Sequence, residues 1–356
     1  MKTEDYIAER HIEVATKYPN LCRLAEKDNV LEFYCDNQTL SSIRSCQGFF
    51  RESFINQLGR KVPANNIDPD RNNLDIGIWF HSVMEYIDKK SFEGIVLTTT
   101  DALFYAKQVW FEQNIEKYRD TKAYETIGGL LGALELVKDY MDFFNPANDG
   151  MKLIATELVF GYDKEAPIVD WATPDKNEAT HLYRAYLVGR PDGVVETPLG
   201  IGPKDYKTSS RIEQVRDMYK PSEQIIGYTY AINKMFGASL APLGKKCNTA
   251  YLIAVNKRMP KNPKERVVKI PYTYSDGELE AYRKRQVATF DMLYEQLVLD
   301  QASVWDTSKC CNWYYKNCPF HKLHSTMPEQ REVVIESFYQ HIEPWNPMTR
   351  GREEKE

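Results

Sequence analysis

The chain has 356 residues, which is room for one large domain or two ordinary ones. Hydrophobic residues make up 42% and aromatic residues 12%, enough for a substantial core, and the formal net charge of −5 excludes a protein that is strongly basic overall. No apolar run approaches the roughly 18 to 20 residues of a membrane span, and residues 1–13 lack the apolar core of a signal peptide. We therefore expect a soluble cytoplasmic protein without a membrane partner.

The first half of the chain is predicted to be mainly helical. A helix is expected over roughly the first 17 residues, and a capped helix begins near Ser41. Residues 75–91 have helical periodicity, which places Gly77, His81 and Glu85 on one stripe, beside an apolar face. Further helices are predicted over 101–118 and 123–144. Residues 75–145 therefore form a mostly helical segment.

The central part of the chain is predicted to form strands. Residues 152–162 read as a strand that carries Glu157, and residues 186–210 read as a β-hairpin that turns at 197–200. Successive side chains of a strand point to opposite faces, so Asp205 and Lys207 share a face. If the hairpin pairs, Asp192 lies beside them. Such carboxylates suit Mg²⁺ or Mn²⁺, although ordinary surface charges at the end of a hairpin are the alternative.

Helices and strands alternate in the rest of the chain. Helices are predicted over 211–218 and from Pro221 to just before Gly237, strands over 249–255 and 267–274, and a long helix from the capping box at Ser275 to about residue 300. The order predicts an α/β or α+β sheet domain with a helical insertion at 75–145.

Several of these residues form an ordered set of motifs. They are Gly77-x-x-x-His81, Glu157, Gly189-x-x-Asp192 followed by Gly-Val-Val, Asp205-Tyr206-Lys207-Thr208, and Gln224-x-x-x-Tyr228. Over residues 40–325 the chain resembles the PD-(D/E)XK nuclease superfamily, in the RecB-type branch that includes CRISPR-adaptation nucleases and phage exonucleases. The resemblance implies a restriction-endonuclease-like mixed sheet flanked by helices, and metal-dependent hydrolysis of phosphodiesters.

The resemblance also implies a role for each motif residue. The metal ligands would be His81, Asp192, Asp205 and the carbonyl of Tyr206, and the remaining catalytic residues would be Lys207, Glu157, Gln224 and Tyr228. Lys207 would stabilise charge on the transition state or orient the attacking water. Each residue has a structural alternative: an interior histidine, an acid on an edge strand, or helix packing for Gln224 and Tyr228. Pro203 departs from the family pattern and predicts a strand that is short, bulged or begins at Lys204.

The cysteines suggest a second metal site. Seven cysteines in a cytoplasmic chain argue against a disulfide framework, and three of them fall within nine positions near the C-terminus. Relatives carry one early and three late cysteines on an iron–sulfur cluster. Here the candidates are Cys46, Cys311 or Cys310, Cys318 and His324. They would hold a [4Fe–4S] cluster or Zn²⁺, and the alternative is a set of buried thiols.

The predicted domains are an N-terminal extension at 1–39, a nuclease domain at 40–326 with the Cys/His segment at 310–324, and a C-terminal helix and disordered tail at 327–356. Candidate DNA contacts are the basic loop 257–264, Lys204, Arg211 and Arg216, although the loop could equally be a solvated hairpin tip. We expect a DNA exonuclease for recombination or repair, bacterial or encoded by a phage and acting in the host cytoplasm. A recombinase or helicase partner fits this function. The alternatives are a CRISPR-adaptation nuclease and an inactive DNA-end-binding module.

Overall fold

The computed structural model describes residues 3–26, 29–61, 72–144, 150–169, 182–198, 200–219, 222–258, 260, 262–299, 312–313 and 316–343. The chain forms two compact units. Unit 1 comprises Met1–Lys61, Val159–Gly189 and Glu280–Glu356, and unit 2 comprises Val62–Leu158 and Arg190–Leu279. Both units are therefore assembled from segments that are far apart in the sequence.

Unit 2 is built on a five-stranded mixed sheet in the order β10-β9-β8-β7-β4. Strands β8 and β9 are parallel, and the other neighbours are antiparallel. The strands are β4 (Lys152–Thr156), β7 (Gly193–Thr197), β8 (Gly200–Ser209), β9 (Thr249–Asn256) and β10 (Val267–Thr273). The helices are α4 (Asn72–Phe92), α5 (Thr99–Glu112), η2 (Ile115–Tyr118), α6 (Lys122–Ile127), α7 (Gly129–Phe144), α8 (Ile212–Tyr219), α9 (Glu223–Leu240), η3 (Ala241–Leu243) and η4 (Pro263–Glu265).

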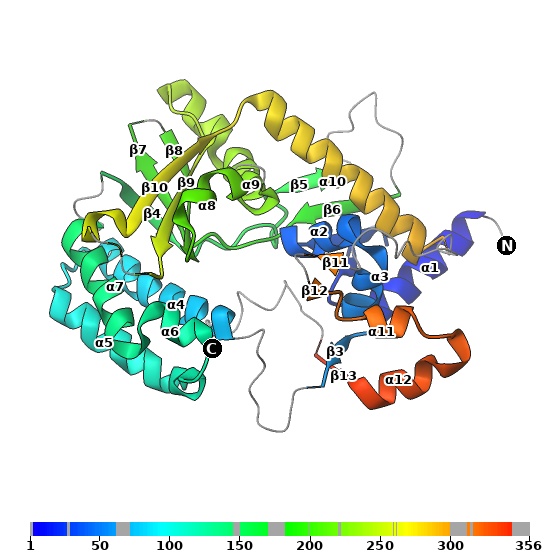
Figure 1. The fold of residues 1–356 in the computed structure, drawn as a ribbon. Helices are drawn as coiled ribbons and strands as arrows, with labels where there is room; N and C mark the ends of the chain where they lie inside the picture. Colours follow the sequence, from blue (N-terminus) through cyan, green and yellow to red (C-terminus); the bar gives the residue numbers. More distant parts are fainter. Residues whose placement is uncertain are drawn as a thin grey trace. The chain divides into compact units, whose positions relative to one another are not determined.

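Helices cover both faces of this sheet. Successive strand residues point to opposite sides, so each face buries its own set of apolar side chains against helices. Val195 and Tyr206 pack into an apolar core with α4–α7, which lie together along the sheet in Figure 1. Val194 and Ile201 face the other way and pack against Ile232 of α9. The predicted α/β class, a mixed sheet flanked by helices, is confirmed.

Strand β8 is continuous, so the expectation of a short or bulged strand, or of one that begins at Lys204, is wrong. Pairing with β7 runs without a break from Gly200 to Lys204, with Pro203 opposite Val194. The backbone N–H groups of alternate residues point to the same side, and that of Ile201 donates toward the β9 side. The missing N–H of Pro203 falls on this side, just before registered pairing with β9 begins at Lys204. The strand therefore accommodates the proline at the end of the β8–β9 ladder.

Two predicted boundaries also differ from the structure. Strand β4 ends at Thr156, because Glu157 takes a left-handed backbone conformation with φ of 46° that ends the extended run. Helix α9 continues through Gly237 to Leu240. A glycine inside a helix costs about 1 kcal/mol relative to alanine but does not stop it, and α9 ends where Pro242 follows.

Unit 1 carries a four-stranded sheet in the order β1-β2-β6-β5, in which β2 and β6 are parallel. Its strands are β1 (Cys22–Leu24), β2 (Leu31–Cys35), β5 (Pro167–Val169) and β6 (Tyr183–Leu187), with the pairs β3 (Leu58–Arg60) with β13 (Tyr339–His341) and β11 (Asn312–Trp313) with β12 (Lys316–Asn317). Its helices are α1 (Thr3–Lys17), α2 (Asn37–Ser45), α3 (Gln47–Phe50), η1 (Arg51–Ile55), α11 (His321–His324), η5 (Pro328–Gln330) and α12 (Arg331–Phe338), together with most of α10 (Asp276–Leu297).

The capping box predicted at Ser275 is present, since the Ser275 side chain accepts from the Glu278 N–H and the Glu278 carboxylate accepts from the Ser275 N–H. None of the helices in the described residues is long and apolar enough to cross a membrane. Residues 349–356, predicted to be a disordered tail, lie outside the described residues.

Candidate active site

The candidate site lies where β7 begins beside β8. The first residue of β7, Gly193, pairs with Lys204, so Asp192 comes directly before the strand. The Asp192 side chain fills the next position, because its Oδ2 accepts the N–H of Tyr206 at 2.7 Å. This hydrogen bond replaces a ladder bond and fixes the carboxylate against β8.

His81 reaches the same carboxylate from helix α4. Its Nδ1 lies 3.2 Å from Asp192 Oδ1, and both side chains are partly exposed. Helix α4 approaches β8 closely, because a Cβ atom on Gly77 would lie 3.9 Å from Thr208 Oγ1. The predicted stripe of Gly77 and His81 thus faces the strand that carries the Asp-Tyr-Lys motif.

Asp205 and Lys207 are paired on the opposite face of β8 from Tyr206. Lys207 Nζ lies 2.6 Å from Asp205 Oδ2, and the Asp205 side chain is almost completely buried. Tyr228 of α9 is buried near this pair, and its hydroxyl accepts from Gln224 Nε2 at 3.2 Å. Gln224 and Tyr228 are therefore linked to each other, and Tyr228 lies close to the Asp205–Lys207 pair.

The pKa values of the four central groups depend on one another. Burial alone would raise the pKa of Asp192, but His81, Lys207 and the Tyr206 N–H together lower it. Burial raises the pKa of Asp205, and the charge of Asp192 adds to this effect although Lys207 opposes it. Burial would lower the pKa of His81 and of Lys207, but the neighbouring carboxylates raise both. The two acids therefore favour the protonated forms of His81 and Lys207.

The carboxylates of this site are the type of ligand that a divalent cation such as Mg²⁺ takes. Asp205 Oδ2 is buried and lies 2.6 Å from Lys207 Nζ, and carboxylate oxygens are what Mg²⁺ and Mn²⁺ prefer. In the structure His81 contacts the Asp192 carboxylate, and Lys207 contacts the Asp205 carboxylate. Within the described residues no group of three or more His, Cys, Asp or Glu side chains is arranged to hold a metal ion as it stands.

Glu157 meets the site through its backbone. Its N–H donates to the carbonyl of Asp192 at 3.2 Å, whereas its carboxylate forms an ion pair with Arg190 at 3.1 Å. The predicted strand position of Glu157 is wrong, because the residue follows the end of β4. The left-handed turn at Glu157 ties the end of β4 to the residue that precedes β7.

A buried charge network on the other face of β8 joins it to α4. Lys204 Nζ lies 2.7 Å from Asp88 Oδ2, and both side chains are almost inaccessible to solvent. Tyr206 donates its hydroxyl to Asp88 at 3.2 Å and shares a 2.9 Å hydrogen bond with Tyr140 of α7. Burial raises the pKa values of Asp88 and Tyr206. The network fixes the helix of His81 to the strand of Asp205. Asp88 lies about two helical turns after His81, and Lys204 and Tyr206 each lie one residue from Asp205.

The sequence contained a signal for this network that our prediction missed. A lysine in the interior of a central strand requires a buried counter-charge, because an unpaired buried ammonium is very costly. Asp88 lies seven residues after His81 and therefore on the same side of the helix. Lys204 is thus not available to a DNA phosphate, and that prediction is wrong.

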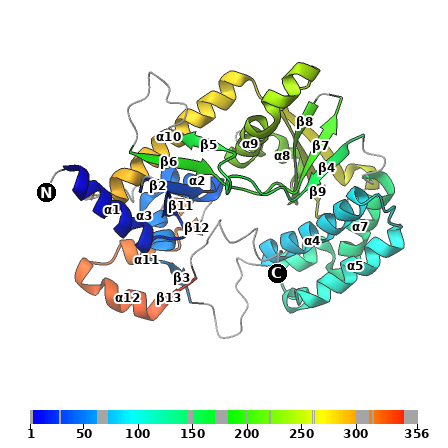
Figure 2. The ribbon, with the colours of Figure 1, turned by 180° about the vertical axis from the view of Figure 1, so that it is seen from behind.

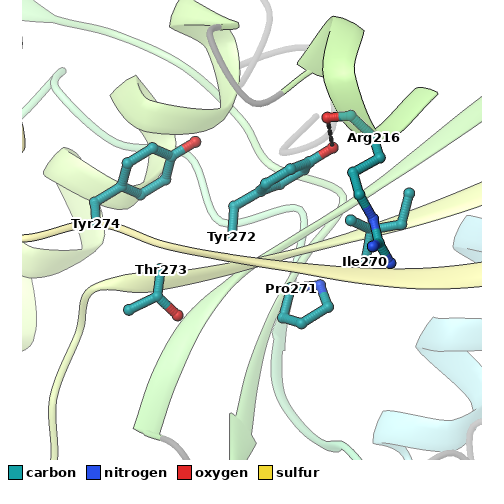
Figure 3. A pocket seen from close by; sticks show the side chains of 6 residues that line it. All are labelled: Arg216, Ile270, Pro271, Tyr272, Thr273 and Tyr274. Carbon is teal, nitrogen blue, oxygen red and sulfur yellow. Dashed lines mark hydrogen bonds between the residues drawn. The ribbon is translucent and has the colours of Figure 1, made fainter. Parts of the chain in front are cut away.

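Two of the other predicted DNA contacts, Lys257 and Arg216, lie in different surroundings. Lys257 is buried, and burial lowers its pKa, so it is a poor phosphate ligand. Arg216 lines a hollow of about 350 Å³ against β10, together with Ile270, Pro271, Tyr272, Thr273 and Tyr274 (Figure 3). The Tyr272 hydroxyl donates to the Arg216 carbonyl at 2.8 Å, which closes one wall of the hollow.

The predicted cysteine cluster is only partly described. Cys310 and Cys311 lie outside the described residues. Cys46 and Cys318 are buried, and the Cys46 thiol accepts the Phe49 N–H at 3.3 Å. His324 lies 3.6 Å from Glu52, and neither of its ring nitrogens has a hydrogen bond to a residue that the structure describes. The described candidates do not form a metal-binding group, so the iron–sulfur or zinc site stays a prediction.

Comparisons with known proteins agree with the motifs. The family model described as the PD-(D/E)XK nuclease superfamily matches residues 38–323, which span both units. No curated protein matches the chain. Proteins of this superfamily cleave phosphodiester bonds and typically use Mg²⁺ or Mn²⁺. The matched region covers most of the sequence, and the chain therefore belongs to the PD-(D/E)XK nuclease superfamily.

Proposed function

We propose that this protein is a metal-dependent DNA nuclease that processes DNA ends as an exonuclease in recombination or repair, with residues 40–326 acting as the nuclease domain. The observation that carries the proposal is the meeting of His81, Asp192, Asp205 and Lys207 around one end of β7. The RecB-type order of the motifs supports the assignment to end processing.

The protein's own residues supply binding and electrostatics. His81, Asp192 and Asp205, with the Tyr206 carbonyl, would hold Mg²⁺ or Mn²⁺, which when bound makes a water more acidic and places positive charge beside the phosphate. The ammonium of Lys207, kept protonated by Asp205, would stabilise negative charge that develops on the scissile phosphate. Gln224 and Tyr228 would hold the floor of the site, and Glu157 would position Arg190.

The test is cleavage of linear duplex DNA with Mg²⁺ or Mn²⁺ by the wild type and by Lys207→Ala. Losing one preorganised electrostatic group typically costs about 100- to 1000-fold in rate. Lys245→Ala is the matched control, because Lys245 is an exposed lysine that pairs with Glu196 on the same sheet. Equal rates for Lys207→Ala and wild type would remove Lys207 from the mechanism.

Two further substrates separate the alternatives. An exonuclease should degrade linear DNA and spare covalently closed circles, whereas cleavage of both at similar rates would indicate an endonuclease. Binding of DNA ends without any cleavage by the wild type in either metal would favour an inactive end-binding module.

A further inference from the structure

Unit 1 contains a surface pocket whose charges are all of one sign. It has a volume of about 320 Å³ and is lined by Arg60, Lys61, Cys318, Pro319, His321, Lys322, Phe338 and Tyr339. Three of these side chains are permanent cations, and none is acidic. In a chain whose net charge is −5, a pocket of this composition requires an explanation.

The three cations have partners, but none of the partners carries a negative charge. Arg60 Nε donates to the Pro319 carbonyl at 3.4 Å, and Lys61 Nζ donates to the Glu336 carbonyl. Lys322 Nζ lies 3.1 Å from the centre of the Phe338 ring. No carboxylate in the described part of the chain forms an ion pair with any of the three.

Two exposed lysines of unit 2 are paired with carboxylates instead. Lys138 lies 2.5 Å from Asp142, and Lys245 is paired with Glu196. Carbonyl oxygens and the face of an aromatic ring can orient a cation without neutralising it. The pocket therefore presents three positive charges that are oriented but not neutralised to any anion that enters it.

The walls of the pocket are joined by hydrogen bonds and include an exposed aromatic ring. Strands β3 and β13 pair through Arg60 and Tyr339, and the Tyr339 hydroxyl donates to the Pro319 carbonyl at 2.9 Å. Figure 2 shows this pair of strands beside α11 and α12. Phe338 remains 47% exposed, with Lys322 over one face of its ring. Basic side chains interleaved with an exposed ring are what a single nucleic-acid strand requires, namely cations for phosphates and a face for stacking a base.

We propose that this pocket binds the phosphate backbone of single-stranded DNA, with Phe338 as a stacking face for a base. The choice of a polynucleotide among phosphate compounds rests on the proposed nuclease function. Binding itself does not, because it requires none of the residues of the candidate active site.

The experiment measures binding of a fluorescent single-stranded oligonucleotide to the full-length protein in chelator, where cleavage does not occur. Lys61→Gln/Lys322→Gln removes two pocket cations, and Lys138→Gln/Lys245→Gln removes the same charge from paired sites. The pocket variant should bind roughly tenfold more weakly and lower the slope of log affinity against log salt by about 1.4, since each of the two lost phosphate contacts on a single strand contributes about 0.7. The control variant should change neither quantity appreciably. Equal losses in the two variants would overturn the proposal, because bulk charge would then explain both.

Further variants separate charge from folding and stacking from charge. Lys61→Arg/Lys322→Arg keeps both cations and should bind like the wild type, and a loss there would contradict a charge-based site. Phe338→Ala should weaken single-strand binding by roughly tenfold without changing the salt slope. Unchanged binding by Phe338→Ala would remove the stacking role.

Competition and cleavage assays complete the test. Inorganic tripolyphosphate that competes as well as the oligonucleotide would show an anion site without strand recognition and overturn the proposal. A wild type that cleaves DNA while the pocket variant binds like its control would refute this inference and leave the nuclease function intact. Selective loss of binding in the pocket variant of a protein that does not cleave would sustain the inference alone.

Discussion

Two charged regions of this protein follow opposite rules. In unit 2, beside β8, Lys204 faces Asp88, Lys207 faces Asp205, and His81 faces Asp192. In the pocket of unit 1, the cations Arg60, Lys61 and Lys322 face carbonyl groups and a ring. The charges of the first region are wholly or partly removed from water, and those of the second remain in contact with it.

The difference follows from the cost of burying a charge. A buried ion without a counter-ion is destabilising by several kcal/mol, so the charges beside β8 can exist only as pairs. A cation at the surface keeps its hydration and can remain without a carboxylate at little cost to stability. Breaking a buried pair is therefore costly to the fold, whereas the cations without a carboxylate partner can be reserved for a ligand.

Breaking the pair beneath the active site should have the largest effect on stability. Asp88→Asn leaves the Lys204 ammonium buried beside an amide, and we expect a loss of about 3–5 kcal/mol in the free energy of unfolding, measured by urea denaturation. Asp88→Leu/Lys204→Met removes both charges and should recover much of this loss.

The matched control for that prediction is Glu196→Gln, which breaks the exposed pair with Lys245 on the same sheet. It should cost far less than Asp88→Asn, because water solvates the lysine that remains. An Asp88→Asn loss no greater than the Glu196→Gln loss would mean that the Asp88–Lys204 pair does not hold α4 to β8.

The sequence was sufficient to predict the parts of the fold that follow local rules. The period of α4, the hairpin of β7 and β8 and the capping box at Ser275 all depend on neighbouring residues, and all three are confirmed. The side-chain alternation that separates Asp205 from Tyr206 is likewise a local property. These features bring the four predicted site residues to one place.

The features that were missed depend on partners distant in sequence. Nothing near Lys204 indicates that its counter-ion is 116 residues away at Asp88. The accommodation of Pro203 depends on where the β9 ladder begins, and the turn at Glu157 depends on its bond to Asp192. The pocket joins β3 near residue 60 to α11 near residue 321, and no spacing motif spans such a separation.

Acid should break a third cluster of charges, which lies in unit 1 and is compensated like the region beside β8. Glu32 is buried beside Arg23, Lys164 and Arg184. Burial would raise the pKa of Glu32, but Lys164, Tyr34 and Arg23 lower it below the ordinary value of 4.5. The stabilisation from Glu32 is therefore complete above its unfolded pKa and is lost as the pH falls through its lower folded pKa.

We expect Glu32→Gln to cost about 1–3 kcal/mol at pH 7, because it removes hydrogen bonds to a charged group. The variant should also show a smaller further loss than the wild type between about pH 5 and pH 3. Urea denaturation at three pH values measures both effects. Glu280→Gln, which breaks a more exposed pair with Arg283, is the control. Parallel pH profiles for wild type and Glu32→Gln would contradict the assignment.

The smallest effect should come from the pocket of unit 1. Lys61→Gln removes an exposed cation that lies near Lys322 and Arg60 and has no carboxylate partner, so the free energy of unfolding should change by less than about 0.5 kcal/mol. If the like charges repel one another measurably, the change should be a small stabilisation that is largest at low salt and disappears at high salt, where screening is strong. Urea denaturation at about 0.02 M and 0.5 M salt measures this. A loss as large as that of Asp88→Asn would place Lys61 among the structural charges, and the distinction between the two regions would no longer hold.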